Sequence, residues 1–202
     1  DSRAINVLLA EHQFARDQVY VLGVVCDGII EGAGFGQPDG QTLQARCQRC
    51  HERTPVVYDT LIGEPPAEGS AGPPEPAVTD ADLEALEAMT PAERAEFWLS
   101  QFDRQVCPMC NCPTCLYERD DSLWVGMGIG LNEKRTFHLG RAYHLAGRCI
   151  GCDECQRVCP MDIPISLLNR KLAREIEAAF GYRAGLEPAP SPITTVLGGR
   201  EG

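Results

Sequence analysis

The sequence predicts a mixed α+β protein, with a partial α/β unit at the N-terminus and a mainly helical domain after it. An apolar stripe at helical spacing opens the chain, a β-branched run over residues 19–26 follows it, and further helical patterns fill the C-terminal half. Residues 63–78 separate the two regions as an acidic linker whose Pro and Gly content prevents regular pairing. We expect an α/β unit over 1–62, that linker, a helical domain over 79–184, and an extended tail over 185–202.

The N-terminal unit begins with an expected helix in which Ile5, Leu8 and Leu9 form one apolar face. The run VYVLGVVC is typical of a buried parallel strand and ends at Cys26. Open α/β sheets bind ligands at the carboxyl ends of their strands, so Cys26 is a candidate ligand. A buried structural thiol is the alternative. Because the chain starts at Asp1 without an initiator methionine, a preceding segment stays an open alternative.

The helical domain shows its first start signal at Thr90-Pro91-Ala92-Glu93, a capping box with proline at the first helical position. That helix is expected to run to about Asp103, with core residues Phe97, Trp98 and Phe102. A second helix is expected to end near Gly147 and to bring Phe137, Leu139, His144 and Leu145 towards the cysteines that follow it. A third helix, ending before Gly181, carries the stripe Ile165, Leu168, Leu172 and Ile176.

The most informative motif is a run of four cysteines followed by Pro160, in the spacing C-x2-C-x2-C-x3-C-P. Its members are Cys149, Cys152, Cys155 and Cys159. This is the spacing of a bacterial ferredoxin site, in which three closely spaced thiolates surround one 4Fe–4S cluster and backbone amides face its sulfur atoms. Zinc sites use two C-x2-C pairs separated by a longer loop, so zinc is the less favoured alternative. The helical domain is therefore expected to be bacterial-ferredoxin-like.

The fourth cysteine of such a run ligates the other cluster when a ferredoxin carries two. An upstream Cys-Pro step exists at Cys107, but the thiolate positions before it hold Phe97, Ser100 and Asp103. The partner cluster is thus expected to be lost, which leaves Cys159 either as a buried thiol or as a ligand of a different metal site. The ligand set expected for the first cluster is Cys107, Cys149, Cys152 and Cys155.

Six further cysteines form the pool for a second 4Fe–4S cluster: Cys26, Cys47, Cys50, Cys110, Cys112 and Cys115. The chain has 11 cysteines, so two all-cysteine clusters are possible and three, which would need about twelve thiolates, are not. Zinc held by Cys47, Cys50, Cys112 and Cys115 is the alternative at this second site. The choice among the three later thiols stays open.

Other candidate residues lie between the cysteine groups. Trp124 and Met127 are interpreted as apolar cover that shields a cluster from solvent, with a plain turn against the core as the alternative. The string GMGIG around Met127 lacks the spacing of a nucleotide fingerprint. His138 and His144 are interpreted as packing residues, because thiolates are already in surplus.

Composition limits the function classes. A chain with 44% hydrophobic residues folds, and an odd number of closely spaced cysteines favours a reducing cytoplasm over a secreted disulfide framework. No apolar stretch approaches the roughly 20 residues of a membrane span. The net charge of −11 argues against nucleic acid and suits an acidic carrier that docks on basic partner surfaces.

The chain resembles iron–sulfur proteins related to the beta subunits of formate dehydrogenases and deazaflavin-reducing hydrogenases, found with heterodisulfide-reductase-like modules. The resemblance rests on VYVLGVVCDG, CPMCNCPTC and FHLGRAYHLAGRCIGCDECQRVCPMDIP. It implies a non-catalytic subunit that relays single electrons to other subunits of a redox complex. Some relatives bind flavin, but no residue here supports flavin in this chain. The alternatives are a structural subunit with one cluster plus zinc, and a fragment of a flavin-containing oxidoreductase.

Overall fold

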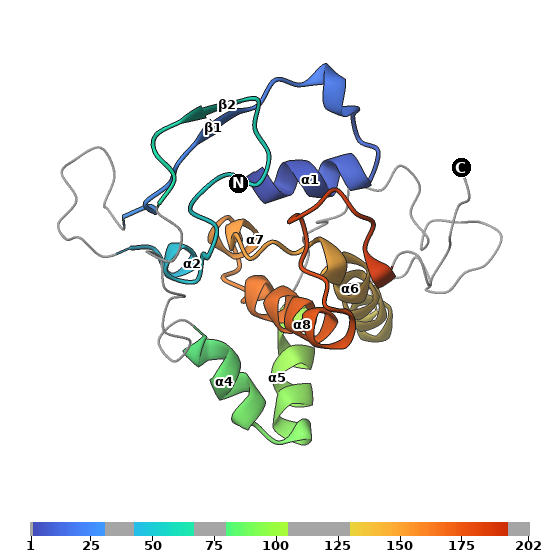
Figure 1. The fold of residues 1–202 in the computed structure, drawn as a ribbon. Helices are drawn as coiled ribbons and strands as arrows, with labels where there is room; N and C mark the ends of the chain where they lie inside the picture. Colours follow the sequence, from blue (N-terminus) through green and yellow to red (C-terminus); the bar gives the residue numbers. More distant parts are fainter. Residues whose placement is uncertain (1, 31–42, 67–79, 105–129, 194–202) are drawn as a thin grey trace. The chain divides into compact units, whose positions relative to one another are not determined.

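The structure is a computed structural model that describes residues 2–30, 43–66, 80–104 and 130–193 (Figure 1). The chain divides into two compact units. We call them the N-terminal unit, Asp1–Glu84 with Ala184–Pro190, and the helical unit, Ala85–Arg183 with Ser191–Gly202. The described elements are helices and one two-stranded parallel sheet, which confirms the mixed α+β class.

The N-terminal unit contains α1 (Ser2–Ala10), the 3₁₀ turn η1 (Arg16–Gln18), β1 (Leu22–Val24), α2 (Ala45–Gln48) and β2 (Thr60–Ile62). The two strands lie side by side in parallel, with Gly23 opposite Leu61 (Figure 1). Gly23 approaches Pro55 and Tyr58 so closely that a Cβ at this position would lie 2.8 Å from the Tyr58 Cβ. Any larger residue at position 23 would therefore clash with the loop that precedes β2.

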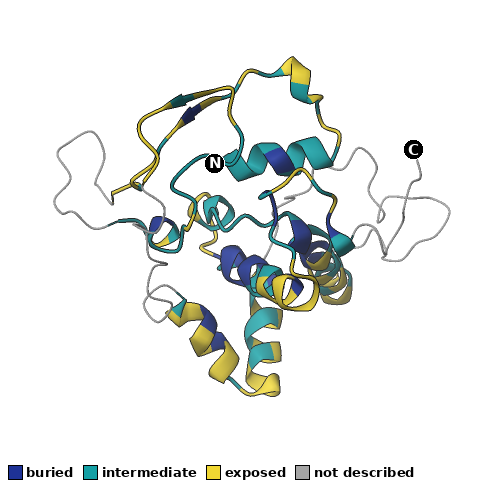
Figure 2. Cartoon of the chain, in the orientation of Figure 1, coloured by how far each residue is buried: buried dark blue, intermediate teal, exposed yellow. Residues whose placement is uncertain are grey.

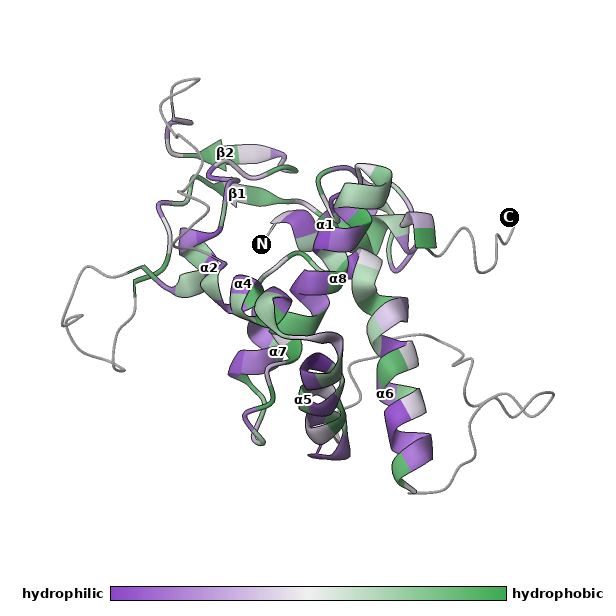
Figure 3. Cartoon of the chain, turned by 90° about the horizontal axis from the view of Figure 1, so that it is seen from below, coloured by the Kyte–Doolittle hydropathy of each residue, from purple (hydrophilic) through white to green (hydrophobic). Residues whose placement is uncertain are grey.

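The prediction of a parallel strand is confirmed, but the prediction that it is buried is wrong. Leu22 and Val24 are 56% and 54% exposed, although β1 has the hydrophobic colour in Figure 3. In Figure 2 the buried colour of β1 is confined to one segment of the strand. Buried parallel strands are covered on both faces, whereas the described sheet has two strands and covers only the Gly23 side. Cys26 is exposed as well, so the alternative that it is a buried structural thiol is also wrong.

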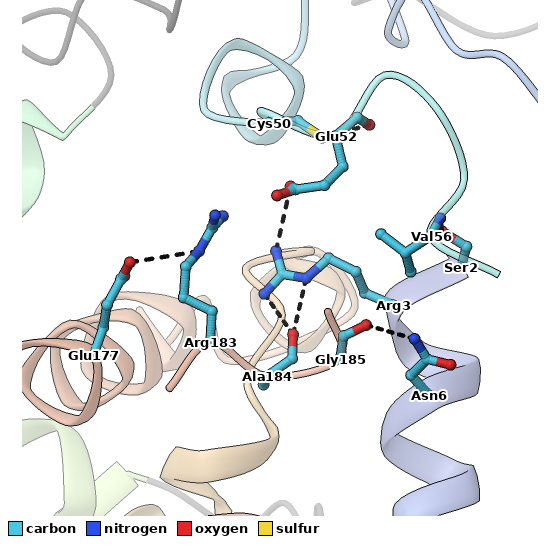
Figure 4. A network of polar contacts seen from close by, with 10 residues as sticks. All are labelled: Ser2, Arg3, Asn6, Cys50, Glu52, Val56, Glu177, Arg183, Ala184 and Gly185. Atoms are coloured by element: carbon cyan, nitrogen blue, oxygen red, sulfur yellow. Dashed lines mark hydrogen bonds and ion pairs between the residues drawn. The ribbon is translucent and has the colours of Figure 1, made fainter. Parts of the chain in front are cut away.

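Helix α1 holds the N-terminal unit together through polar contacts that its apolar stripe did not predict (Figure 4). Arg3 donates to the Ala184 carbonyl from Nε at 2.9 Å and Nη2 at 2.6 Å, and its Nη1 lies 3.7 Å from Glu52. Asn6, only 3% exposed, donates to the Gly185 carbonyl at 3.0 Å. Ile5, Leu8 and Leu9 are half-buried. Residues 184–190 are thus bound to the start of the chain.

The helical unit contains α5 (Pro91–Arg104), α6 (Leu131–Leu145), the 3₁₀ turn η3 (Ala146–Arg148), α7 (Glu154–Arg157) and α8 (Ile165–Phe180). The boundary between the units falls within α4 (Ala81–Ala88). Helix α8 packs against α6, η3 and α7, and α5 packs against α6. Gly181, with φ 64°, ends α8 in the left-handed conformation that favours glycine. The three expected helices of this domain are confirmed.

The core of the helical unit differs from the predicted core at two aromatic residues. Phe102 is buried, but Phe97 and Trp98 are half-buried. His138, expected to be a packing residue, is buried on α6 and stacks on Phe102, with 6.4 Å between ring centroids. Leu139 on the same helix is 46% exposed. The buried residues of α6 are His138, Arg141 and Ala142, so the buried face of this helix is partly polar.

Among the described helices, none combines the length and the apolar character of a membrane span.

The capping box at the start of α5 gives a first prediction. Glu93 N donates to Thr90 Oγ1 at 3.3 Å, and Thr90 N donates to Glu93 Oε2 at 2.8 Å. Thr90→Ala removes the cap oxygen and is expected to lower the free energy of unfolding by about 1 kcal/mol. Urea denaturation measures the change. Ser100→Ala, on an exposed face of the same helix, is the control and is expected to stay within about 0.5 kcal/mol.

Candidate metal centre

The loop from Cys149 to Cys159 joins η3 to α8 and passes through α7, which carries Cys155. Two left-handed residues bend it, Gly151 at φ 74° and Asp153 at φ 55°. Gly151 has this freedom because it lacks a Cβ, and aspartate is one of the few other residues that adopt the conformation. Cys149, Cys152 and Cys155 are all half-buried. Cys159 is half-buried as well, so the buried-thiol alternative does not describe it.

The three thiols Cys149, Cys152 and Cys155 lie close enough to act on one another electrostatically. Burial raises the pKa of the Cys149 thiol to about 11, and the neighbouring Cys152 adds to this rise. A hydrogen bond from the Gly151 amide lowers the pKa and so opposes it. Burial likewise raises the pKa of Cys155 to about 11, with Cys149 and Cys152 adding to it and the Gln156 amide opposing. Backbone amides therefore point at two sulfur atoms. Such donors stabilise thiolate charge once a metal has displaced the protons.

The donor set fits an iron–sulfur cluster in its chemistry, although its ligands are not all described. None of the seven described cysteines forms a disulfide. Among the described residues, no three His, Cys, Asp or Glu side chains converge on a point that could hold a single metal ion. A cubane is wider than a single ion, and the expected fourth ligand, Cys107, lies outside the described residues. Three thiols with amide donors in one loop suit such a group.

A polar face of α8 lies against this loop, and sequence reasoning missed it. Ser166, Asn169 and Arg170 are buried, and Figure 2 shows the buried side of α8 in dark blue. Ser166 Oγ lies 2.6 Å from Gln156 Oε1, and Asn169 Nδ2 lies 4.0 Å from Cys155 Sγ. Arg170 Nε lies 3.7 Å from Asp153 Oδ1. The sequence did contain a signal for this face, because Ser166, Asn169 and Arg170 have the spacing i, i+3 and i+4 that places residues on one side of a helix.

The N-terminal unit gathers the second group of cysteines around the turn after β1. Gly28 N donates to Cys26 Sγ at 3.3 Å, and Ile29 N donates to Cys47 Sγ at 3.2 Å. A Cβ at Gly28, whose φ is 104°, would lie 3.3 Å from the Cys47 Cβ. Cys50 follows one helical turn later and contacts the Glu52 carbonyl. One turn therefore supplies amides to two sulfur atoms from separate parts of the chain.

The remaining predicted site residues lie outside the described residues: Cys107, Cys110, Cys112, Cys115, Trp124 and Met127. The positions Phe97, Ser100 and Asp103 lie in the continuous helix α5. Asp103 accepts two bonds from Arg135, at 2.8 and 2.7 Å. The next residue, Arg104, donates to the Met161 carbonyl at 2.6 Å. This contact joins the end of α5 to Met161, two residues after Cys159. Arg104 itself is three residues before Cys107 in the sequence.

The Asp103–Arg135 pair predicts a dependence of stability on pH. The hydrogen bond from Arg135 lowers the pKa of Asp103 below its ordinary value of 3.8. A carboxyl with a lowered folded pKa stabilises the fold above its unfolded pKa, and this stabilisation is lost as the pH falls through the folded value. The difference in free energy of unfolding between the unsubstituted protein and Asp103→Asn should therefore be constant above about pH 5 and shrink below about pH 4.

Comparison with known proteins gives a partial sequence match to a dehydrogenase subunit. No known family model matches the chain. Over 93 residues, 46% of its length, the chain is 31% identical to the F420-dependent formate dehydrogenase subunit beta of Methanocaldococcus jannaschii. The chain is similar to a formate dehydrogenase beta subunit. It spans only 24% of that relative's length. The formate dehydrogenase part of the predicted resemblance is confirmed, and the hydrogenase and heterodisulfide-reductase parts stay predictions.

Proposed function

We propose that this chain is an iron–sulfur electron-transfer subunit of a larger redox complex. The observation that carries the proposal is the loop of Cys149, Cys152 and Cys155, in which half-buried thiols receive backbone amides and lie against a polar helix face. When bound there, a 4Fe–4S cluster takes up and releases single electrons. The three thiolates would hold the cluster, and the amides of Gly151 and Gln156 would stabilise the negative charge on their sulfur atoms.

The proposed ligands form two sets. Cys149, Cys152 and Cys155 would hold the first cluster, with Cys107 as the fourth ligand. Cys26, Cys47 and Cys50 would hold the second, completed from Cys110, Cys112 or Cys115. The amides of Gly28 and Ile29, which bond to Cys26 and Cys47, support this second set. Two centres would make the chain a relay between other subunits.

The relative suggests the class of complex. It is a subunit of a formate dehydrogenase that depends on F420. We propose that this chain likewise works beside a dehydrogenase or hydrogenase subunit, from which it receives electrons, and an acceptor subunit, to which it delivers them. The similarity covers a quarter of the relative, so formate and F420 are proposed as chemistry of the complex and not of this chain.

A structural zinc is the second candidate at the N-terminal cysteines. The residues described in the N-terminal unit bury few large apolar side chains, and Cys47 itself is one of the buried positions. Small units with small cores are often stabilised by a metal, whose binding energy becomes folding energy. Cys47-x2-Cys50 supplies one of the two pairs that a zinc site needs.

Metal analysis separates the two candidates. The full chain would be purified without oxygen, assayed for iron, sulfide and zinc, and studied by EPR before and after dithionite reduction. About eight irons per chain with reducible cubane signals would support the two-cluster relay. About four irons with one zinc would assign the N-terminal cysteines to a structural site. A protein with no reducible signal would contradict electron transfer altogether.

A further inference from the structure

A partly buried ion pair joins the cysteine loop of the helical unit to α8. Arg170 on α8 and Asp153, between Cys152 and Cys155, are joined at 3.7 Å between Nε and Oδ1. Their side chains are only 8% and 22% exposed. Charges removed from water to this degree are weakly screened by salt and act strongly on neighbouring groups.

Both charges lie beside the thiols of this loop. Asp153 directly follows Cys152 in the chain. Arg170 directly follows Asn169, whose Nδ2 lies 4.0 Å from Cys155 Sγ. At such short range a carboxylate disfavours further negative charge on a neighbouring group, and a guanidinium favours it. The two members of the pair therefore act in opposite directions.

Fold stability alone gives a poor explanation of this pair. Replacing a buried ion pair with apolar residues of similar size is often neutral or stabilising, since both charges must be desolvated. Asp153 also occupies a left-handed conformation, at φ 55°, which is unfavourable for most residues. Ser166 and Asn169 already contact the loop from the same helix. The pair lies beside the three thiols, where its charges act on any group that the thiols hold.

We propose that the Asp153–Arg170 pair sets the reduction potential of the centre held by Cys149, Cys152 and Cys155. The inference rests on the proposed function, since it requires a redox centre in this loop. Reduction adds one electron, and hence one negative charge, to the centre. Arg170 stabilises that charge and Asp153 opposes it, so the balance of the pair determines how readily the reduced state forms. Asp153 and Arg170 are positioning residues, because they act on the centre without ligating it.

A set of four variants tests the proposal on the full metal-loaded chain. The set is Asp153→Asn, Arg170→Met, the double variant and Arg170→Lys, each titrated with dithionite under EPR observation. Arg170→Met is expected to make reduction about tenfold less favourable, a fall of about 59 mV for one electron. Asp153→Asn is expected to raise the reduction potential by a similar amount. The double variant and the charge-preserving Arg170→Lys should stay near the unsubstituted value.

Iron content and unfolding temperature separate a change of potential from a structural defect. A purely structural pair would lower the unfolding temperature and leave the potential unchanged. The proposal is overturned if the single variants carry the normal amount of iron and keep the normal potential. If Arg170→Met does not fold, Asp153→Asn decides alone, and an unchanged potential in it rejects the idea. If the unsubstituted chain carries no reducible centre, the proposed function fails and this inference fails with it.

Discussion

Cys152→Ser is expected to remove about four irons per chain and to abolish the reducible EPR signal of the centre in the helical unit. The reason is that Cys152 lies between Cys149 and Cys155 in the bent loop and shares its electrostatic environment with both. A cluster that loses one of its thiolates loses a covalent bond and an anionic charge together. The iron held by the N-terminal cysteines should remain bound.

Cys159→Ser is the matched control for this experiment. Cys159 belongs to the same motif and is half-buried like the other three, but the expected ligand set does not include it. The control should keep the iron and the EPR signal of the unsubstituted chain. Normal iron content in Cys152→Ser would reject the ligand assignment. Loss of iron in both variants would move the fourth ligand from Cys107 to Cys159.

Gly185→Ala is expected to lower the free energy of unfolding by about 3 kcal/mol, the largest stability effect that the structure predicts. Gly185 has φ 78°, and a Cβ there would lie 2.2 Å from the Arg3 carbonyl oxygen and 2.8 Å from its carbon. Both atoms belong to the backbone of α1, so no side chain can rotate out of the way. The segment 184–190 or α1 must move, which breaks the bonds that Arg3 and Asn6 donate.

Gly181→Ala provides a control with the same backbone conformation and open space. Its φ is 64°, and no atom lies within 4 Å of the position that a Cβ would occupy. Only the left-handed strain applies, so the expected loss is about 1 kcal/mol. Urea denaturation measures both variants, and hydrogen exchange locates the effect: α1 amides should exchange faster in Gly185→Ala and stay unchanged in Gly181→Ala. Equal losses in the two would contradict the close approach to Arg3.

The residues that local chemistry controls were predictable. The Thr90 and Glu93 capping box marks the start of α5, because the bonds of a cap join residues three apart. Gly181 marks the end of α8 for a similar local reason. The spacing of Cys149, Cys152 and Cys155 predicted that a loop carries these residues, and they do lie in and around the bent loop between η3 and α8. These features depend on neighbours in the sequence, so the sequence contains the information directly.

The contacts between distant segments were not predictable in the same way. Asn6 and Arg3 are bound to carbonyls near residue 185, which no local pattern indicates. The hydrophobicity of β1 predicted burial, yet burial depends on what covers a strand, and the described sheet leaves Leu22 and Val24 exposed. The fourth ligand of the proposed cluster likewise stays a prediction, because it must come from a distant part of the chain.

The sequence alone therefore determined the fold class, the helix ends and the spacing of the cysteines, because each is encoded by residue types at short, regular separations. The tertiary structure alone decided that polar residues beside the apolar stripe of α8 are buried, and so placed Ser166, Asn169 and Arg170 against the cysteine loop. A polar residue on a helix has the same local signature whether it faces solvent or a partner. Only the packing of the loop over α8 turned Asp153 and Arg170 into an ion pair shielded from water.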